Sequence, residues 1–161
     1  MNSTDTSTPE QRSQQAAQII KDYAFRSSVA GFVPIPLVDT LGLIGIQRLM
    51  LFRLSKLYGV PFKKNLATIS LSTLTSSLTV RAASPLLGSA LKMIPGVGTL
   101  AGGASMAALN SASTYAVGKV FQQHYEQGGT LKDFNPEQAK GTFEETLQKE
   151  KARESAAKCQ Q

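Results

Sequence analysis

Hydrophobic and polar positions follow one another along this chain with the three- and four-residue spacing of helices. The first apolar stripe runs from Ala16 to Ala24. Thr8 can cap a helix ahead of it, and Pro9 can take the first helical position, where a missing amide costs nothing. The pattern predicts a helix from Pro9 to just before Gly31, preceded by a disordered tail over residues 1–8.

The most apolar stretch follows a double proline. Pro34 and Pro36 cannot both lie inside a helix, because each lacks an amide donor and a proline disfavours helical geometry in the residue before it. From Leu37 to Tyr58, apolar residues cover almost every side of a helical wheel, and Gly59 suits a left-handed cap. A helix that is apolar all round is buried at the centre of a protein or lies in a membrane.

A third helix is expected to open at Pro61, and its apolar stripe consists of Ala67, Leu71, Leu74 and Leu78. The Ser and Thr residues between 68 and 79 favour caps or strands, but strand alternation fails at Leu74, so we predict a helix. A short helix is expected to follow from Ser84-Pro85 to Met93.

A second break, Pro95-Gly96-Val97-Gly98, precedes a long predicted helix from Thr99 to Glu126. Its first half is almost all small residues, which would let another backbone come close and would allow an oligomer. Gly128-Gly129 end this helix. Asn135-Pro136-Glu137 then start a charged final helix, which is expected to dock loosely through Phe143 and Leu147.

Together these patterns predict an all-α, single-domain bundle of five or six helices, with the helices over residues 37–58 and 99–126 at its centre. Residues 9–130 are the expected helical core domain, and 131–161 a charged C-terminal helix and tail. At an offset of 59 residues, Ile35–Leu41 matches Ile94–Leu100 at five of seven positions. Either the two central helices are equivalent halves of a pseudo-symmetric bundle, each preceded by an Ile-Pro turn, or such turns simply look alike.

Composition narrows the class of protein without choosing one. At 161 residues, 42% of them hydrophobic, the chain can bury a single core. Its one cysteine, Cys159, cannot form a disulfide within the chain, which suits a reducing cytosol. The first fourteen residues are polar and lack the apolar region of a signal peptide.

The net charge of +6 is concentrated in the middle of the chain. Between Thr40 and Tyr125 there are eight Lys and Arg residues and no Asp or Glu, which indicates an anionic partner: lipid headgroups, an acidic protein face or nucleic acid. Five of these bases fall within seventeen residues and are candidates for contact with an anionic surface: Arg48, Arg53, Lys56, Lys63 and Lys64. A solvated basic loop that only aids solubility is an equally weighted alternative.

Two groups of residues resemble the YcjF-like family. One is Pro34-x-Pro36 with Asp39, Gln47, Met50 and Leu57-Tyr58-Gly59; the other is Ile94-Pro95-Gly96-x-Gly98 with Thr114-Tyr115-Ala116-Val117-Gly118. The resemblance covers residues 15–130. YcjF-like is a bacterial domain of unknown function, often fused to or encoded beside Era-type GTPases and described as membrane-associated. It implies a GTPase partner, since this chain has no GTPase domain of its own. It makes these residues structural or interaction candidates: Pro34, Pro36, Asp39, Gln47, Pro95, Gly96, Gly98, Tyr115 and Gly118.

Groups that could carry chemistry are few. His124, the only histidine, is expected to be a solvated helix-end residue, and Cys159 an inert thiol. The glycines around Gly96 lack the lysine and Ser/Thr of a phosphate-binding loop and fit close helix packing better. Asp39 is interpreted as a favourable charge at a helix N-terminus, with a buried switch carboxylate as the alternative. Gln47 could bond to a facing helix. We expect no enzyme, no metal and no cofactor.

Three functions stay open. The first is a non-enzymatic membrane-associated or adaptor module that works with a GTPase, in the cytoplasm and peripheral to, or inserted in, the inner membrane. The second is a basic nucleic-acid-binding protein, although no aromatic stacking platform or recognition-helix motif is visible. The third is a conditionally inserting helical hairpin: Met93–Gly118 is an uncharged run long enough to span a bilayer, but its proline, glycines and Asn110 disfavour insertion.

Overall fold

The fold is known from a computed structural model that describes residues 7–30, 36–82 and 98–158. Within these ranges the chain forms five helices and no strand: α1 Pro9–Ala30, α2 Pro36–Leu57, α3 Lys64–Ala82, α5 Gly98–Glu126 and α6 Pro136–Lys158. The prediction of an all-α, single-domain bundle is confirmed. The expected short helix from Ser84 to Met93 and residues 1–6 of the expected tail lie outside the described residues.

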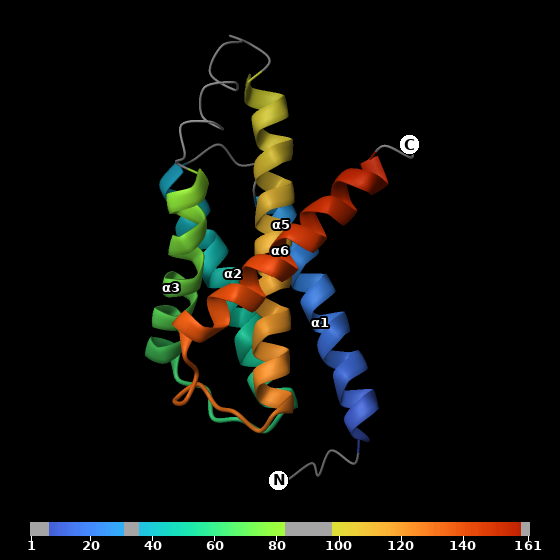
Figure 1. Ribbon diagram of the computed structural model, residues 1–161. Coiled ribbons are helices and arrows are strands. Elements are labelled where there is room, and N and C mark those ends of the chain that lie inside the picture. The colour runs from blue at the N-terminus through green and yellow to red at the C-terminus, as the bar shows by residue number, and fades with distance from the viewer. Residues whose placement is uncertain (1–6, 31–35, 83–97, 159–161) are drawn as a thin grey trace.

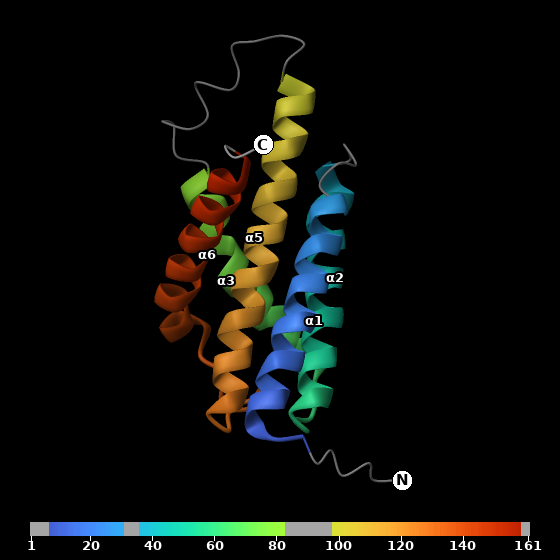
Figure 2. The same ribbon diagram turned by 90° about the vertical axis from the view of Figure 1, so that its right-hand side faces the viewer.

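Helix α5 is the central element, and it contacts all four of the other described helices. Figure 2 shows α1 and α2 on one side of α5 and α3 and α6 on the other, and in Figure 1 α6 crosses α5 obliquely. Helices α2 and α5 run in the same direction, because successive residues of one pair with successive residues of the other: Gln47 with Thr114, Ser55 with Tyr125 and Tyr58 with Glu126.

Local sequence signals set the helix ends. Thr8 caps α1: its hydroxyl accepts from the Gln11 amide, and the Gln11 side chain accepts from the Thr8 amide in return. Gly59 and Gly128 adopt φ of 68° and 84° and close α2 and α5, respectively. At each end the next amide bonds back five residues, from Val60 to Ser55 and from Gly129 to His124. The helix ends predicted at Gly59 and Gly128-Gly129 are thus present.

The core is one cluster to which every described helix contributes. Its largest fully buried apolar side chains are Ile20, Met50, Leu51, Leu54, Leu71, Leu74, Val117, Phe121 and Phe143. Helices α1 and α5 approach each other closely where Ile20 lies directly over Gly118. A Cβ placed on Gly118 would come within 2.7 Å of an Ile20 side-chain carbon. The α1–α5 contact therefore depends on a residue without a side chain.

The expectation that the apolar helix over residues 37–58 lies at the centre, buried on all sides, is wrong. Leu49 is 58% exposed and Phe52 48% exposed, because α2 lies at the edge of the bundle and presents one side to solvent. The long helix predicted over residues 99–126 does occupy the centre, where small residues such as Ala112 and Ala116 are completely buried.

Two further expectations are corrected by the packing. Helix α3 begins at Lys64 and not at Pro61, because Pro61 and Phe62 form the turn and the Phe62 ring packs against Phe52. The first half of α6 is not loosely docked: Phe143 and Leu147 are buried in the common core, and α6 contacts both α5 and α3.

The 59-residue repeat does not describe the helix ends. It equates Gly59, which closes α2, with Gly118, which lies inside α5, whereas the residue that closes α5 in the same way as Gly59 is Gly128. The residues Ile35 and Ile94-Pro95, on which the proposed equivalence of the preceding turns depends, lie outside the described residues.

Candidate functional site

The outer face of α2 combines apolar and basic side chains. Because Gln47, Met50, Leu51 and Leu54 point into the core, the residues about half a helical turn away point out. These are Leu49, Phe52, Arg53 and Lys56, and all four are exposed. We call these four residues the α2 outer face. It exposes two apolar and two basic side chains to solvent.

The turn after α2 extends this face toward α3. Phe52 and Phe62 meet edge to face with ring centroids 5.4 Å apart, and Lys63 and Lys64 follow directly and are exposed. Of the five predicted bases, Arg53, Lys56, Lys63 and Lys64 are therefore exposed beside exposed apolar side chains, whereas Arg48 is half-buried.

These charges are not neutralised by neighbouring acids. In the described part of the chain, no ion pair joins any of the five bases to a carboxylate. On α6, by contrast, Lys140 and Lys149 each lie 2.6 Å from a glutamate, Glu137 and Glu145. The outer face of α2 and its turn thus keep a positive charge that could attract an anionic surface.

Buried polar pairs fix α2 to α5 behind this face. The fully buried Gln47 donates from Nε2 to the Thr114 hydroxyl at 3.4 Å, so the expected bond to a facing helix is present. Its Oε1 atom has no partner among the described residues. Further along the same two helices, the Ser55 and Tyr125 hydroxyls lie 3.0 Å apart. At the ends of the helices, the Tyr58 hydroxyl donates to the Glu126 carboxylate at 2.8 Å.

The ends of α1, α2 and α5 meet at Glu126. Burial acts to raise the pKa of its carboxyl, but the hydrogen bonds from Gln122 and Tyr58 outweigh burial and lower it. The pKa of Tyr58 is raised, mainly by burial of its hydroxyl and next by its hydrogen bond to Glu126. Gln122 also bonds to the Ser13 carbonyl and hydroxyl of α1. Glu126 is therefore engaged within the bundle at the end where the basic turn lies.

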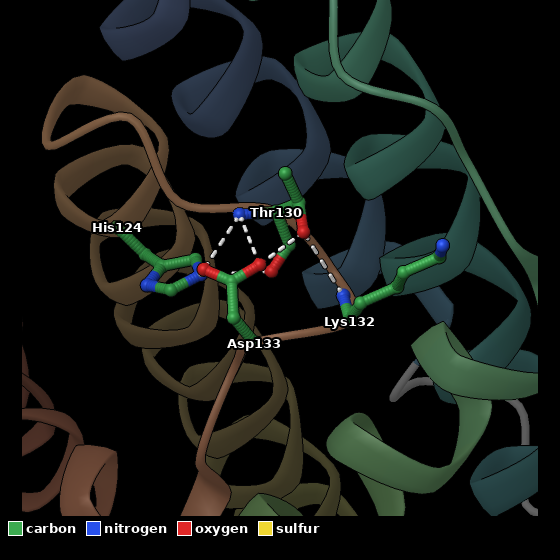
Figure 3. Close-up of polar contacts among 4 residues, drawn as sticks. All are labelled: His124, Thr130, Lys132 and Asp133. Carbon is green, nitrogen blue, oxygen red and sulfur yellow. Dashed lines mark hydrogen bonds and ion pairs between the residues drawn. The ribbon is translucent and has the colours of Figure 1, made fainter.

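His124 lies in a polar cluster that sequence reasoning missed (Figure 3). Its Nε2 donates to the Thr130 carbonyl at 2.8 Å and lies 3.6 Å from Asp133, whose carboxylate also accepts from the Thr130 amide and hydroxyl. The Thr130 hydroxyl is the main cause of the lowered pKa of Asp133. His124 is thus held in the α5–α6 turn and is not the freely solvated residue expected. The signal was the double glycine, because a Cβ on Gly129 would lie 2.4 Å from the imidazole ring.

This cluster supports the turn and lacks the arrangement of a catalytic pair. The imidazole N–H donates a hydrogen bond to the Thr130 carbonyl, and the Asp133 carboxylate accepts one from the Thr130 amide. A cavity of about 220 Å³ is lined by His124 and Asp133 together with four amide side chains and four other residues; the amides are Gln123, Gln127, Asn135 and Gln138. Nowhere in residues 7–30, 36–82 and 98–158 do three His, Cys, Asp or Glu side chains gather as metal ligands would.

The residues chosen from the family resemblance are dispersed. Gly118 and Gln47 are buried at the contacts of α5 with α1 and α2, and Tyr115 is half-buried against the core. Pro36 and Asp39 fall in the first turn of α2 and Gly98 begins α5, with backbone alone described. Pro34, Pro95 and Gly96 lie outside the described residues, as does Cys159, which was not among these candidates. Of the candidates whose side-chain surroundings the structure describes, Gln47, Tyr115 and Gly118 thus lie in or against α5.

Of the helices described, none combines the length and the apolar character that a bilayer span requires. In the uncharged run Met93–Gly118, the described side chains from Ala107 onward are mostly buried against the other helices, so their transfer to lipid would require the bundle to open.

The chain belongs to the DUF697 family, a domain of unknown function, whose family model matches residues 2–152. Among proteins with curated descriptions, it is similar to "Magnetosome membrane protein 22" of Magnetospirillum gryphiswaldense, with 34% identity over 138 residues, which cover 85% of this chain and 71% of that protein. No solved structure is a significant match.

Proposed function

We propose that this protein is a non-enzymatic module that associates with an anionic membrane surface and works with a GTPase partner. The observation that carries the membrane part is the α2 outer face with its turn, where exposed Leu49 and Phe52 lie beside exposed bases that no described acid pairs. Apolar side chains surrounded by Lys and Arg are what an anionic lipid surface attracts. The magnetosome membrane relative supports the same choice.

The GTPase part of the proposal rests on the resemblance to YcjF-like proteins. The adaptor role fits side chains that hold helices together, such as the pairs Gln47 with Thr114 and Ser55 with Tyr125, in place of an acid–base pair beside a nucleophile. In this proposal the protein is cytoplasmic and peripheral to the inner membrane, with residues 9–130 as the core domain and 131–161 as a charged extension.

Vesicle flotation tests the membrane part. The variant Lys56→Gln/Lys63→Gln/Lys64→Gln removes three exposed bases, each of which should contribute about 1 kcal/mol near an anionic surface. Its affinity for vesicles containing phosphatidylglycerol should fall about a hundredfold. The control Lys140→Gln/Lys149→Gln/Arg153→Gln makes the same change in net charge at bases that already lie within 3.7 Å of an acid, and it should bind almost as the native protein does. Equal losses in the two variants would refute a localised surface.

Affinity purification from membrane and soluble fractions tests the partner. Recovery of a GTPase with the native protein would support the adaptor role. A nucleic-acid-binding protein is the second candidate, because the same unpaired bases would attract phosphate backbones. Recovery of nucleic acid without a GTPase, and no flotation with vesicles, would favour that candidate.

A further inference from the structure

The outer face of α3 differs from the α2 outer face in having no charge. Asn65, Ile69, Ser72 and Ser76 recur at three- and four-residue spacing and are all exposed, and Ile69 is 60% exposed. From Asn65 to Val80 the sequence has no acid and no base. An exposed isoleucine on an uncharged helix face gains little from water and would gain from an apolar medium.

Four hydroxyl groups on this helix bond to backbone carbonyls of the same helix, and one of them, Ser76, belongs to the outer face. Thr68 donates to the Lys64 carbonyl at 2.9 Å, Thr73 to Ile69 at 2.9 Å, Thr75 to Leu71 at 2.7 Å and Ser76 to Thr73 at 2.9 Å. Burying a hydroxyl in an apolar medium is costly only when its hydrogen bond is lost. Because these bonds lie within the helix, they would persist if the surrounding water were replaced by acyl chains.

A bond of this kind does not by itself indicate a lipid-facing surface. Thr146 on α6 donates to the Thr142 carbonyl at 2.8 Å, but its neighbours include the charged Glu145 and Lys149. On α3 the same bonds occur on a helix without charge for sixteen residues. The combination distinguishes α3 from α6.

The bases lie where such a helix would need them. Lys63 and Lys64 are exposed at its N-terminal end, and their long stems would let the ammonium groups reach lipid phosphates while the face below them lies deeper. Phe62, directly before them, packs on Phe52 and so joins this end of α3 to the α2 outer face.

We propose that the outer face of α3 is the part of the protein that enters the lipid. Resting on the membrane association proposed above, α3 lies along the bilayer surface with Ile69 at the boundary between headgroups and acyl chains, roughly 5–10 Å deep, and with Lys63 and Lys64 among the headgroups. The lipid-facing surface is thus α3, while the bases of the α2 outer face provide long-range attraction.

Single-tryptophan probes test this orientation, because the chain has no tryptophan. Ile69→Trp places the probe on α3, Leu49→Trp on α2, and Gln148→Trp on an exposed position of α6 as the control. Each protein is mixed with phosphatidylglycerol–phosphatidylcholine vesicles, with and without brominated acyl chains. On vesicle binding, the fluorescence emission of the tryptophan at 69 should shift to shorter wavelength. Brominated chains should quench it at least twofold more strongly than the tryptophan at 148, and the tryptophan at 49 should lie in between.

The controls separate this inference from the proposed function. If all three proteins float with vesicles but the probe at 69 is quenched no more than the probe at 148, α3 does not enter the lipid, while membrane association stands. If neither these three proteins nor the native protein floats with vesicles, both proposals are wrong. A second variant, Ile69→Asn, changes an exposed residue and should leave the helical circular dichroism unchanged; it should weaken vesicle binding about tenfold, and unchanged binding would contradict the inference.

Discussion

Replacing Gly118 by alanine should loosen the contact between α1 and α5. The added Cβ would lie 2.7 Å and 2.8 Å from the two γ carbons of Ile20 and 3.2 Å from its Cβ. These atoms lie close to the α1 backbone, so a rotamer change cannot remove the overlap and α1 has to move. Overpacking of this kind costs about 1–3 kcal/mol.

A matched control separates the overlap from helix propensity. Gly45 lies within α2, and nothing lies within 4 Å of a Cβ built on it. Gly45→Ala should therefore gain about 0.5–1 kcal/mol, since alanine is the better helix former. The same gain is present in Gly118→Ala, so the difference in unfolding free energy between the two variants should equal the overlap alone, about 1–3 kcal/mol.

Urea unfolding followed by circular dichroism at 222 nm measures this difference. The double variant Ile20→Ala/Gly118→Ala should show that the Gly118 substitution costs less once the γ carbons are gone, a coupling of about 1 kcal/mol or more. If Gly118→Ala were as stable as Gly45→Ala, or if the coupling were zero, the close α1–α5 contact would not exist in solution.

Two further predictions concern the polar groups of the core. Gln47→Met should leave the free energy of unfolding within about 1 kcal/mol of native or raise it, because the buried Oε1 has no described partner and the bond to Thr114 is long at 3.4 Å. A loss above about 2 kcal/mol in urea unfolding would show that the Gln47 amide forms stronger hydrogen bonds than these contacts indicate. Because hydrogen bonds lower the pKa of Glu126 in the folded state, its stabilising effect is present above the unfolded pKa of about 4.3 and is lost as pH falls through the folded value. Glu126→Gln should therefore flatten stability between about pH 5 and pH 3, by under about 1 kcal/mol because the side chain is exposed, and an unchanged pH slope would exclude this contribution.

Apolar periodicity, together with capping residues and glycines, was sufficient to predict most helix ends. Thr8, Gly59 and Gly128 act locally, through bonds to residues at most five positions away, so their effect can be predicted from the sequence. Hydropathy did not predict which helix is central, because it cannot tell an apolar side that faces the core from one that faces outward, as Leu49 does.

Contacts between distant residues could not be predicted in the same way. That Gln47 would bond across to another helix could be expected, but the choice of Thr114, 67 residues away, depends on the packing register of α2 against α5. The place of His124 depends on the missing side chain of Gly129, which lets the turn close over the imidazole. The basic cluster was visible in the sequence, whereas its position beside exposed Phe52 follows from α2 being an edge helix.

In the proposed function, bases around Lys56, Lys63 and Lys64 attract an anionic membrane. The most direct test is the ratio of vesicle partition coefficients between the native protein and the variant with these three lysines changed to Gln, measured at low and at high salt. Because salt screens exposed charges, with a Debye length of about 10 Å at 0.1 M and about 3 Å at 1 M, the ratio should fall from about a hundred at low salt toward one at high salt. A ratio that stays the same at both salt concentrations, or that is already one at low salt, would contradict electrostatic membrane attraction by this surface.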